Sequence, residues 1–145
     1  MKKFLAAVLA TLMCISLAAC GRNPSSGSGE KEDIPQPPDL IGEWKQTNSN
    51  SEDSYQSATI TEDTIEIYWV SDGGDTKSLY WAGTYVAPTT ADEPYVWDSE
   101  NDHSKTDVSL LASGDDTKTM TYQDGVLSYE ASALGTTMKI KLEKQ

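Results

Sequence analysis

Large apolar side chains recur at every second position through most of the chain beyond Ile41. The segment 64–70 shows the pattern plainly, because Ile65, Ile67 and Trp69 alternate with residues of other kinds. Successive side chains of a β-strand point to opposite faces of the sheet, so a period of two is typical of a strand with one buried face. The chain is therefore expected to fold mainly into β-sheet, with helix confined to the connections.

Polar turn residues divide this pattern into short segments. We expect strands at 41–47, 55–61, 64–70, 76–87, 95–100, 117–123, 126–132 and 136–143. The connections include a turn at 71–75, the pair Asp124-Gly125, which favours a type I′ hairpin turn, and the pair Leu134-Gly135. Closing the sheet on itself removes its two exposed edges. We predict an all-β, antiparallel barrel of about eight strands, with a β-sandwich as the alternative.

The segment 76–87 contains a glycine in its middle. Alternation places Leu79, Trp81, Gly83 and Tyr85 on one face of the strand. A glycine inside a strand weakens it and often marks a bend or a β-bulge, which barrel corners need. We therefore predict a bend or bulge at Gly83.

The stretch 101–113 lacks the strand pattern. We expect it to be irregular, with a short helical turn within 106–112, before the last three strands. Val108, Leu110 and Leu111 would then supply apolar contacts to the barrel.

The first expected strand opens with Gly42-x-Trp44, which resembles the Gly-x-Trp opening of lipocalin-like barrels. In that family the tryptophan closes the base of the barrel beneath an arginine from a late strand. This chain has no arginine after Arg22, so the resemblance implies that Lys139 or Lys141 takes that position. The family's other signature motifs are absent.

The start of the chain divides into a charged pair, an apolar run and a cysteine. Lys2 and Lys3 precede an apolar run at 4–17, which ends in Leu17-Ala18-Ala19-Cys20. The run is shorter than the roughly 20 residues of a membrane-spanning helix and has the length of a signal-peptide core. Its last four residues match the lipobox of bacterial lipoproteins. We predict a lipoprotein signal peptide at 1–19 and lipidation of Cys20 with fatty-acyl chains such as palmitate.

A polar segment separates Cys20 from the strands. Residues 20–39 are rich in Gly, Ser, Pro and charges, with Ile34 as the only large apolar side chain, which is typical of a flexible tether. A diacylglyceryl cysteine supplies the two chains that stable anchoring needs. We therefore expect a barrel domain at 40–145, lipid-anchored to the cell membrane and facing outside the cytoplasm, with a Gram-positive surface favoured over a periplasm.

The charge and cysteine content exclude some functions. The formal net charge is −12, and loss of residues 1–19 would leave 9 basic and 23 acidic residues. So acidic a chain repels phosphate backbones, which excludes nucleic acid as a partner. Cys14 lies within the signal and Cys20 carries the lipid, so no thiol is left for a disulfide or a metal site.

Three short stretches near the end of the chain are distinctive. They read NDHSKTD at 101–107, LLAS at 110–113 and SALGTT at 132–137. With them, the tail from Asn101 to Lys144 resembles a group of small Gram-positive surface lipoproteins. That group has no assigned activity, so the resemblance implies the location and leaves the activity open.

His103 is the only histidine and the natural starting point for a search for catalysis. A triad would combine it with Ser104 or Ser109 and with Asp102 or Asp107, but residues so close in sequence rarely adopt triad geometry. The domain also lacks a Gly-x-Ser-x-Gly nucleophile elbow. We interpret His103 as a loop residue with local hydrogen bonds.

Acidic residues are too frequent to identify a site by themselves. Asp98, Glu100 and Asp102 alternate, but a calcium loop that begins at Asp98 would need glycine where His103 stands. A carboxylate pair for glycoside hydrolysis, such as Glu43 with Glu66, is one of many equivalent choices. We predict no catalytic residue, no metal site and no cofactor.

Tryptophan and tyrosine carry the clearest functional signal, because they combine an apolar body with a polar tip and favour ligand walls. Alternation predicts that Trp44, Trp69 and Trp81 point inward. An outer row of tyrosines is expected from Tyr68, Tyr80 and Tyr95. The alternative is that most of these rings fill a small barrel. The candidate binding surface or pocket comprises Trp44, Tyr68, Trp69, Tyr80, Trp81, Tyr95 and Trp97.

These observations leave three hypotheses for the function. The leading one is a monomeric, non-enzymatic binding module, held on the membrane by lipid, for a protein or small-molecule ligand. The second is an inhibitor or protective lipoprotein that captures cationic proteins such as lysozymes, in keeping with the negative charge. The third is a hydrolase with an unrecognised site.

Overall fold

The computed structural model describes residues 34–133 and 135–145. The predicted signal peptide, the lipidation site Cys20, most of the predicted tether and Leu134 of the predicted turn lie outside the described residues. The stretch Ile34–Gln145 forms one compact unit. Since every strand finds its partners within this unit, we expect it to fold without the residues that precede it.

Eight antiparallel strands confirm the predicted all-β class. The short helices are η1 (Asp72–Gly74) and α1 (His103–Thr106). Asp124 and Gly125 have φ values of 52° and 81°, so both adopt the positive φ that a type I′ turn requires. The strands are β1 (Gly42–Gln46), β2 (Tyr55–Ile60), β3 (Thr64–Ser71), β4 (Thr76–Thr84), β5 (Tyr95–Glu100), β6 (Thr117–Gln123), β7 (Val126–Ala133) and β8 (Thr136–Lys144).

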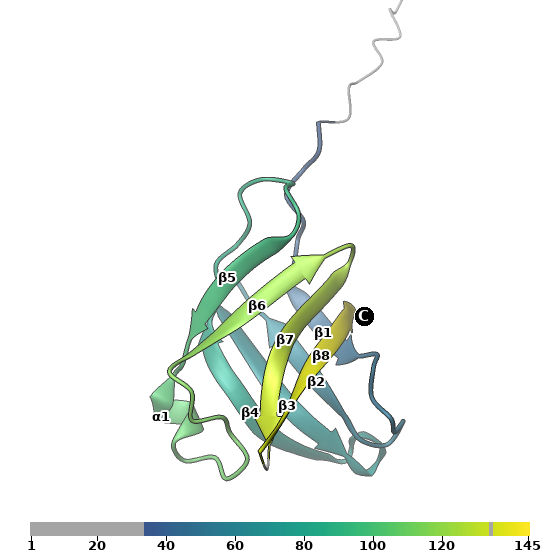
Figure 1. Ribbon diagram of the computed structural model, residues 1–145, viewed down its shortest axis with the longest axis vertical. Helices are drawn as coiled ribbons and strands as arrows, with labels where there is room; N and C mark the ends of the chain where they lie inside the picture. The colour runs from purple at the N-terminus through teal and green to yellow at the C-terminus, as the bar shows by residue number, and fades with distance from the viewer. Residues whose placement is uncertain (1–33, 134) are drawn as a thin grey trace, which may run out of the picture. The chain divides into compact units, whose positions relative to one another are not determined.

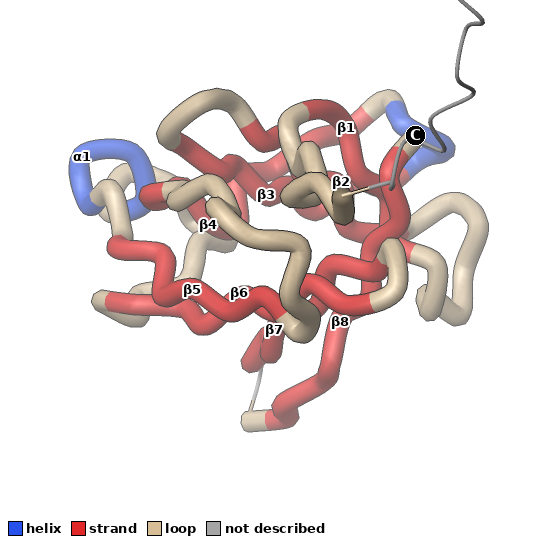
Figure 2. The backbone as a smooth tube through the Cα atoms, turned by 90° about the horizontal axis from the view of Figure 1, so that it is seen from above, coloured by secondary structure: helices blue, strands red, loops and turns tan. Residues whose placement is uncertain are grey.

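The strands form one sheet in the order β4-β3-β2-β1-β8-β7-β6-β5. Pairing of β1 with β8 joins its two halves. In Figure 2, β1 to β4 occupy one side of the barrel and β5 to β8 the other. The sheet curls until its two ends, β4 and β5, approach one another (Figure 1). The fold is thus a nearly closed barrel and not the alternative sandwich.

The two ends of the sheet meet at Gly83 of β4, which forms a bridge with Asn101 just beyond β5. A Cβ at Gly83 would lie 2.5 Å from the carbonyl oxygen of Glu100 and 2.7 Å from Nε1 of Trp81. Such distances leave no room for a side chain, so glycine is what allows the two backbones to touch. Gly83 therefore closes the barrel and is not the site of the predicted bulge.

The β-bulge lies earlier in β4, at Tyr80. Ile67 of β3 pairs with Trp81 and Tyr68 pairs with Leu79, so Tyr80 is an extra residue. Tyr80 and Trp81 are both buried, with 2% and 0% of their surface exposed. The predictions that Tyr80 faces solvent and that Leu79 shares the inner face are wrong, because the bulge shifts the alternation by one residue.

Large side chains fill the interior of the barrel. Trp44 and Trp81 are fully buried, which confirms their predicted inward orientation. Leu40 is buried at the end where β1 begins, and its carbonyl oxygen accepts a hydrogen bond of 2.9 Å from Nε1 of Trp44. Lys144 of β8 donates to the carbonyl oxygen of Asp39 over 2.8 Å. The segment before β1 is therefore packed onto this end of the barrel.

The cation inside the barrel comes from β6. Lys139 and Lys141, predicted to replace the arginine of lipocalin-like barrels, are both exposed, so that prediction is wrong. Lys118 instead has a side chain that is only 5% exposed. Its ammonium nitrogen lies 5.0 Å from the ring of Trp81, a distance suited to cation–π attraction.

Lys118 also fills a gap between two strands. β6 and β7 pair only where Thr121–Gln123 faces Val126–Ser128, and beyond this they separate around a surface cavity of about 380 Å³. The Lys118 ammonium donates to the carbonyl oxygen of Glu130 over 3.3 Å and to Oδ2 of Asp115 over 3.1 Å. It thus gives a strand carbonyl a partner where the sheet is interrupted.

The predicted helical turn at 106–112 is wrong in position, because α1 spans His103–Thr106. Asp102 caps this helix by accepting a hydrogen bond of 3.1 Å from the backbone N–H of Ser104, and a cap fixes where a helix begins. The three apolar residues that follow do not pack on the barrel as expected. Their exposed fractions are 83% for Val108, 97% for Leu110 and 53% for Leu111.

Gly83→Ala should lower the free energy of unfolding by about 1–3 kcal/mol, because the added methyl group overlaps atoms of both meeting strands. Gly114→Ala is the control, since no heavy atom lies within 4 Å of its Cβ position. We expect a change within about 0.5 kcal/mol there. Urea unfolding followed by tryptophan fluorescence measures both variants. Equal stability of the two would contradict closure at Gly83.

Candidate ligand-binding end of the barrel

One end of the barrel holds a cavity of about 490 Å³. It lies where β1, β3 and β7 end and β2, β4 and β8 begin. Its walls come from the β1–β2 connection and 69–71 of β3, with Ser78, Leu111 and Met138 completing them. Its lining residues include no charged side chain.

The β1–β2 loop forms one wall of the cavity and is held against β8 by Asn48. The amide nitrogen of Asn48 donates to the carbonyl oxygen of Lys139 over 2.8 Å, and its amide oxygen accepts from the N–H of Lys141 over 3.0 Å. The hydroxyl of Ser49 donates to the carbonyl oxygen of Ser54 over 2.5 Å. A side-chain amide can satisfy a donor and an acceptor at once, so one residue fixes this wall.

Trp69 of β3 forms the inner wall. It is half-buried and lies opposite Gln56 of β2, on the inner face of the sheet. Its ring meets that of Tyr80 edge-on, with the centroids 5.3 Å apart. Tyr80 in turn stacks on Tyr129, with the centroids 6.4 Å apart. Trp69 therefore separates the cavity from a layer of buried aromatic rings.

Polar atoms lie within this buried layer. The hydroxyl of Tyr129 donates to the amide oxygen of Gln56. Burial holds the pKa of Tyr129 well above its usual value, so the hydroxyl remains a donor. Among the described residues, Nε2 of Gln56 and the hydroxyl of Tyr80 have no hydrogen-bond partner. A buried donor without a partner is costly, so these two atoms make the core behind Trp69 locally unfavourable.

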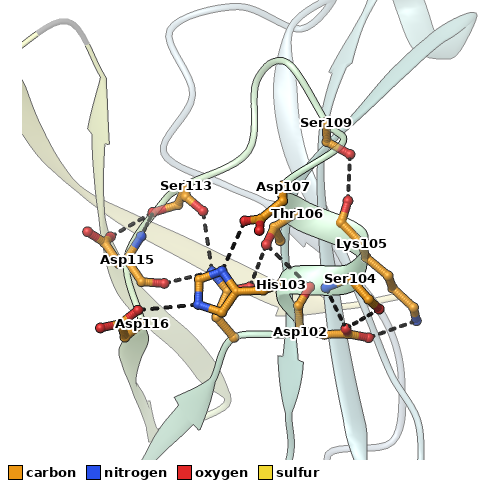
Figure 3. A network of polar contacts seen from close by, with 11 residues as sticks. Asp102, His103, Ser104, Lys105, Thr106, Asp107, Ser109, Ser113, Asp115 and Asp116 are labelled. Carbon is orange, nitrogen blue, oxygen red and sulfur yellow. Dashed lines mark hydrogen bonds and ion pairs between the residues drawn. The ribbon is translucent and has the colours of Figure 1, made fainter.

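Residues 107–116 form a loop beside the cavity, the rim loop, which contributes Leu111 to the lining. His103 ties both ends of the rim loop to α1 (Figure 3). Its Nδ1 lies 3.0 Å from Oδ1 of Asp107, and its Nε2 lies 3.2 Å from Oδ1 of Asp116. One side chain, His103, therefore anchors both ends of the rim loop.

Two further hydrogen bonds hold the rim loop to the barrel. Nδ2 of Asn101 donates to the carbonyl oxygen of Asp115 over 2.6 Å. The N–H of Ser113 donates to the carbonyl oxygen of Tyr80 over 2.8 Å. Tyr80 is the bulged residue of β4, so the rim loop supplies a partner that β3 does not.

His103 faces carboxylates and not serines. Its hydrogen bond to Asp107, more than any other contact, raises the pKa of the imidazole above its usual 6.5. The hydroxyl of Ser104 donates to Oδ1 of Asp102 over 2.5 Å, and that of Ser109 donates to a backbone carbonyl over 3.0 Å. The serine–histidine contact of a triad is thus not formed among the described residues.

Only Trp69 of the seven predicted aromatic residues lines the cavity. Tyr95 is half-buried, packs against the core, and donates its hydroxyl hydrogen to the carbonyl oxygen of Val86 over 2.7 Å. Because Tyr80 is buried and Tyr95 packs on the core, the predicted outer row of tyrosines is wrong. Three other members of the set are buried in the core: Trp44, Trp81 and Trp97.

Tyr68 does lie on the outer face of β3, where it helps to position α1. Its hydroxyl donates to Oε2 of Glu66 over 2.7 Å, and Lys105 of α1 approaches Oε1 of the same carboxylate at 2.7 Å. Burial, with the Glu66 hydrogen bond second, raises the pKa of Tyr68 to about 12. The hydrogen bond from Lys105 lowers the pKa of Glu66. This contact fastens α1 to the barrel.

Apart from Trp69, none of the residues that line the cavity was predicted from the sequence as a site residue, and neither was Gln56 behind the wall. A signal existed for Gln56, because it stands at an inward position of β2 where the alternation calls for an apolar residue. Leu111 and Met138 reach the cavity from loop and hairpin segments that come together only when the barrel closes.

Within residues 34–133 and 135–145, no three His, Cys, Asp or Glu side chains are placed to share a metal ion. Over the same ranges, no helix has the length and apolar character needed to cross a membrane. Comparisons of the chain with protein-family models, curated proteins and solved structures found no match. Function is therefore inferred from the arrangement of the residues themselves.

His103 should titrate with a midpoint above its ordinary 6.5. It is the only histidine of the chain, so its ring-proton NMR signal is unambiguous in protein without a histidine tag. Asp107→Asn and Asp116→Asn should each lower the midpoint, since each removes a carboxylate that favours the imidazolium. Asp98→Asn, whose carboxylate bonds to Thr119, is the control and should leave it unchanged. A wild-type midpoint at or below 6.5 would contradict the arrangement.

The contacts of His103 with the two carboxylates should make the rim loop sensitive to pH. The pKa of His103 is higher in the folded than in the unfolded chain, so its stabilising effect is full below pH 6.5 and is lost as the pH rises through the folded midpoint. Rim-loop amides should therefore lose protection against hydrogen exchange above that midpoint, after correction for the intrinsic pH dependence of exchange. His103→Gln should abolish this step.

Proposed function

We propose that this protein is a lipid-anchored, extracytoplasmic binding module whose ligand occupies the cavity at the end of the barrel. The observation that carries the proposal is the neutrality of that cavity. Its lining includes no charged side chain, although the chain has 23 acidic and 11 basic residues. A concave, uncharged site with an aromatic wall is typical of a small-molecule site.

The side chains around the cavity favour an uncharged ligand that contains a ring. Trp69 offers an apolar aromatic surface, and the loop 47–54 offers serine hydroxyls and asparagine amides. A molecule with one apolar face and several hydrogen-bonding groups matches this set.

Binding without chemical change fits the cavity better than hydrolysis does. General acid–base catalysis needs a titratable side chain within hydrogen-bond reach of the reacting group. The lining includes no Asp, Glu, His, Cys or Lys, and Tyr55 is its single side chain of a type that can act as a general acid or base. The support for a binding role is therefore stronger than that for the hydrolase hypothesis.

The position of the cavity suits an anchored protein. The chain enters β1 from Leu40, whereas the cavity lies beyond the other end of β1, at Gln46. An anchor on Cys20 therefore connects to the barrel away from the cavity. The second candidate function, capture of a cationic protein, is favoured by the net charge of −12.

Trp69 should report on ligand binding, because the other three tryptophans are buried. We expect a library of uncharged sugars and aromatic amides, screened against residues 34–145 by ligand-observed NMR, to contain a binder that protects Trp69 from acrylamide quenching. Trp69→Ala should weaken that binding at least about tenfold, since burying a large apolar side chain contributes roughly 1.5–3 kcal/mol.

Tyr95→Ala is the matched control, because Tyr95 is another half-buried aromatic residue and begins β5, at the opposite end of the barrel from the cavity. It should bind the same ligand with unchanged affinity. Equal losses in the two variants, or retention of full affinity by Trp69→Ala, would place the ligand elsewhere and contradict the proposal. Circular dichroism of each variant checks the fold.

Cys20→Ser should abolish lipid attachment and the cleavage that follows it, so the variant lacks the lipid anchor. A serine has no thiol to accept the diacylglyceryl group, so neither lipid attachment nor cleavage at the lipobox should occur at the normal site. Fractionation of expressing cells, with metabolic labelling by radioactive palmitate, measures both effects. Ser28→Ala in the tether is the control and should remain labelled. Membrane association of Cys20→Ser with unchanged processing would contradict lipid anchoring.

A further inference from the structure

The rim loop displays apolar side chains in solvent. Val108 and Leu110 are 83% and 97% exposed, and their neighbour Leu111 is 53% exposed. Single exposed apolar residues are ordinary on protein surfaces, but adjacent ones form a patch that is typical of an interaction site. These three residues are the apolar tip of the rim loop.

The hydrogen bonds of the rim loop fix the apolar tip in place. His103 contacts a carboxylate at each end of the loop (Figure 3). The side chain of Asn101 and the N–H of Ser113 hold its second half. A surface that is already ordered loses little conformational entropy when a partner binds. The tip is thus presented in a form suited to recognition.

The surroundings of the apolar tip are acidic. Three loops meet at this end of the barrel, at 47–54, 72–75 and 107–116, and every charged residue in them is Asp or Glu. Asp107 and Asp116, which flank the tip, have side chains that are 70% and 93% exposed. Lys105 and Lys118, which lie next to the rim loop, are already paired with carboxylates. The field around the tip is therefore negative.

We propose that the rim loop is a docking surface for a cationic protein that presents an aliphatic patch bordered by lysine or arginine. The partner's aliphatic groups cover Val108 and Leu110, and its cations face the acidic loops. The same field repels an anionic membrane and a second copy of this chain. The inference concerns the second candidate function and does not depend on a ligand in the cavity.

Model peptides test this surface. The first probe is an amphipathic helix of leucine and lysine, added to residues 34–145 labelled for methyl NMR. The comparison peptides replace every lysine with glutamate or every leucine with serine. We expect the leucine–lysine peptide to shift the Val108 and Leu110 methyl signals and to bind at least about tenfold more tightly than either comparison peptide. Its affinity should fall as salt rises from about 0.05 M to about 0.5 M.

Two double variants distinguish binding at the apolar tip from nonspecific hydrophobic binding. Val108→Ser with Leu110→Ser should reduce the affinity at least about tenfold. Val86→Ser with Val96→Ser is the control and should leave it unchanged. Val86 and Val96 are also exposed, at 57% and 51%, but belong to the β4–β5 loop and β5. All four sites are exposed, so the fold should survive in both variants.

Other occupants of the rim loop give different results. Binding of anionic lipid vesicles through Val108 and Leu110 would overturn the proposal in favour of a membrane. Self-association that the Val108→Ser, Leu110→Ser variant abolishes would overturn it in favour of a second copy of the chain. Equal binding of the leucine–lysine and leucine–glutamate peptides would overturn the role of charge. Loss of cavity-ligand binding in Trp69→Ala would leave the proposal unaffected, since Trp69 is not part of the apolar tip.

Discussion

The contact between β4 and the end of β5 is the constraint on which the rest of this structure depends. Gly83 has no side chain, so the backbone of Asn101 comes close enough to bridge the two ends of the sheet. The next residue continues the contact, since the N–H of Asp102 donates to the carbonyl oxygen of Ala82 over 2.8 Å. Asp102 also caps α1, so the helix and the rim loop begin from a fixed point. The contacts that close the barrel therefore also position the helix and the rim loop beside the candidate site.

The bulge at Tyr80 determines where a ligand has room. An eight-stranded barrel has an interior just wide enough for side chains or one small ligand. Tyr80 and Trp81 both turn inward at the bulge, and the stem of Lys118 enters from β6 and brings its ammonium next to their rings. With the centre filled in this way, the cavity next to Trp69 forms at the end of the barrel. The bulge in β4 thus adds one large side chain to the filled centre of the barrel.

Local patterns in the sequence predicted the parts of the fold that depend on local causes. The alternation in 64–70 and the Asp124-Gly125 pair identified a strand and a hairpin correctly, because side-chain period and turn chemistry act within a few residues. The inward position of Tyr80 was not predictable in this way. It follows from the β-bulge, in which β4 has one residue more than the segment of β3 that it pairs with. Lys118 in the core was likewise unexpected, because its partner Glu130 belongs to another strand.

The candidate site was predicted only in part for the same reason. Trp69 was recognised from its residue type. The walls that face it come from segments far apart in the sequence, and no local pattern predicts that these segments lie together. Gln56 is the instructive exception, because a polar residue at an inward strand position conflicts with its surroundings. Such a conflict can be read from the sequence, and here it lies directly behind the cavity wall. Aromatic content was a poor guide to the cavity, because it mostly reflected the filling of the core.

The two proposed binding surfaces differ in chemistry and share one residue. The cavity has no charged lining, whereas every charged residue of the loops around it is acidic. Leu111 belongs to both, since it lines the cavity and stands in the rim loop next to Leu110. A partner docked on the apolar tip would cover one wall of the cavity, and a ligand in the cavity would change the position available to Leu111. Because His103 contacts both ends of that loop, we expect its protonation to affect the two proposed surfaces together.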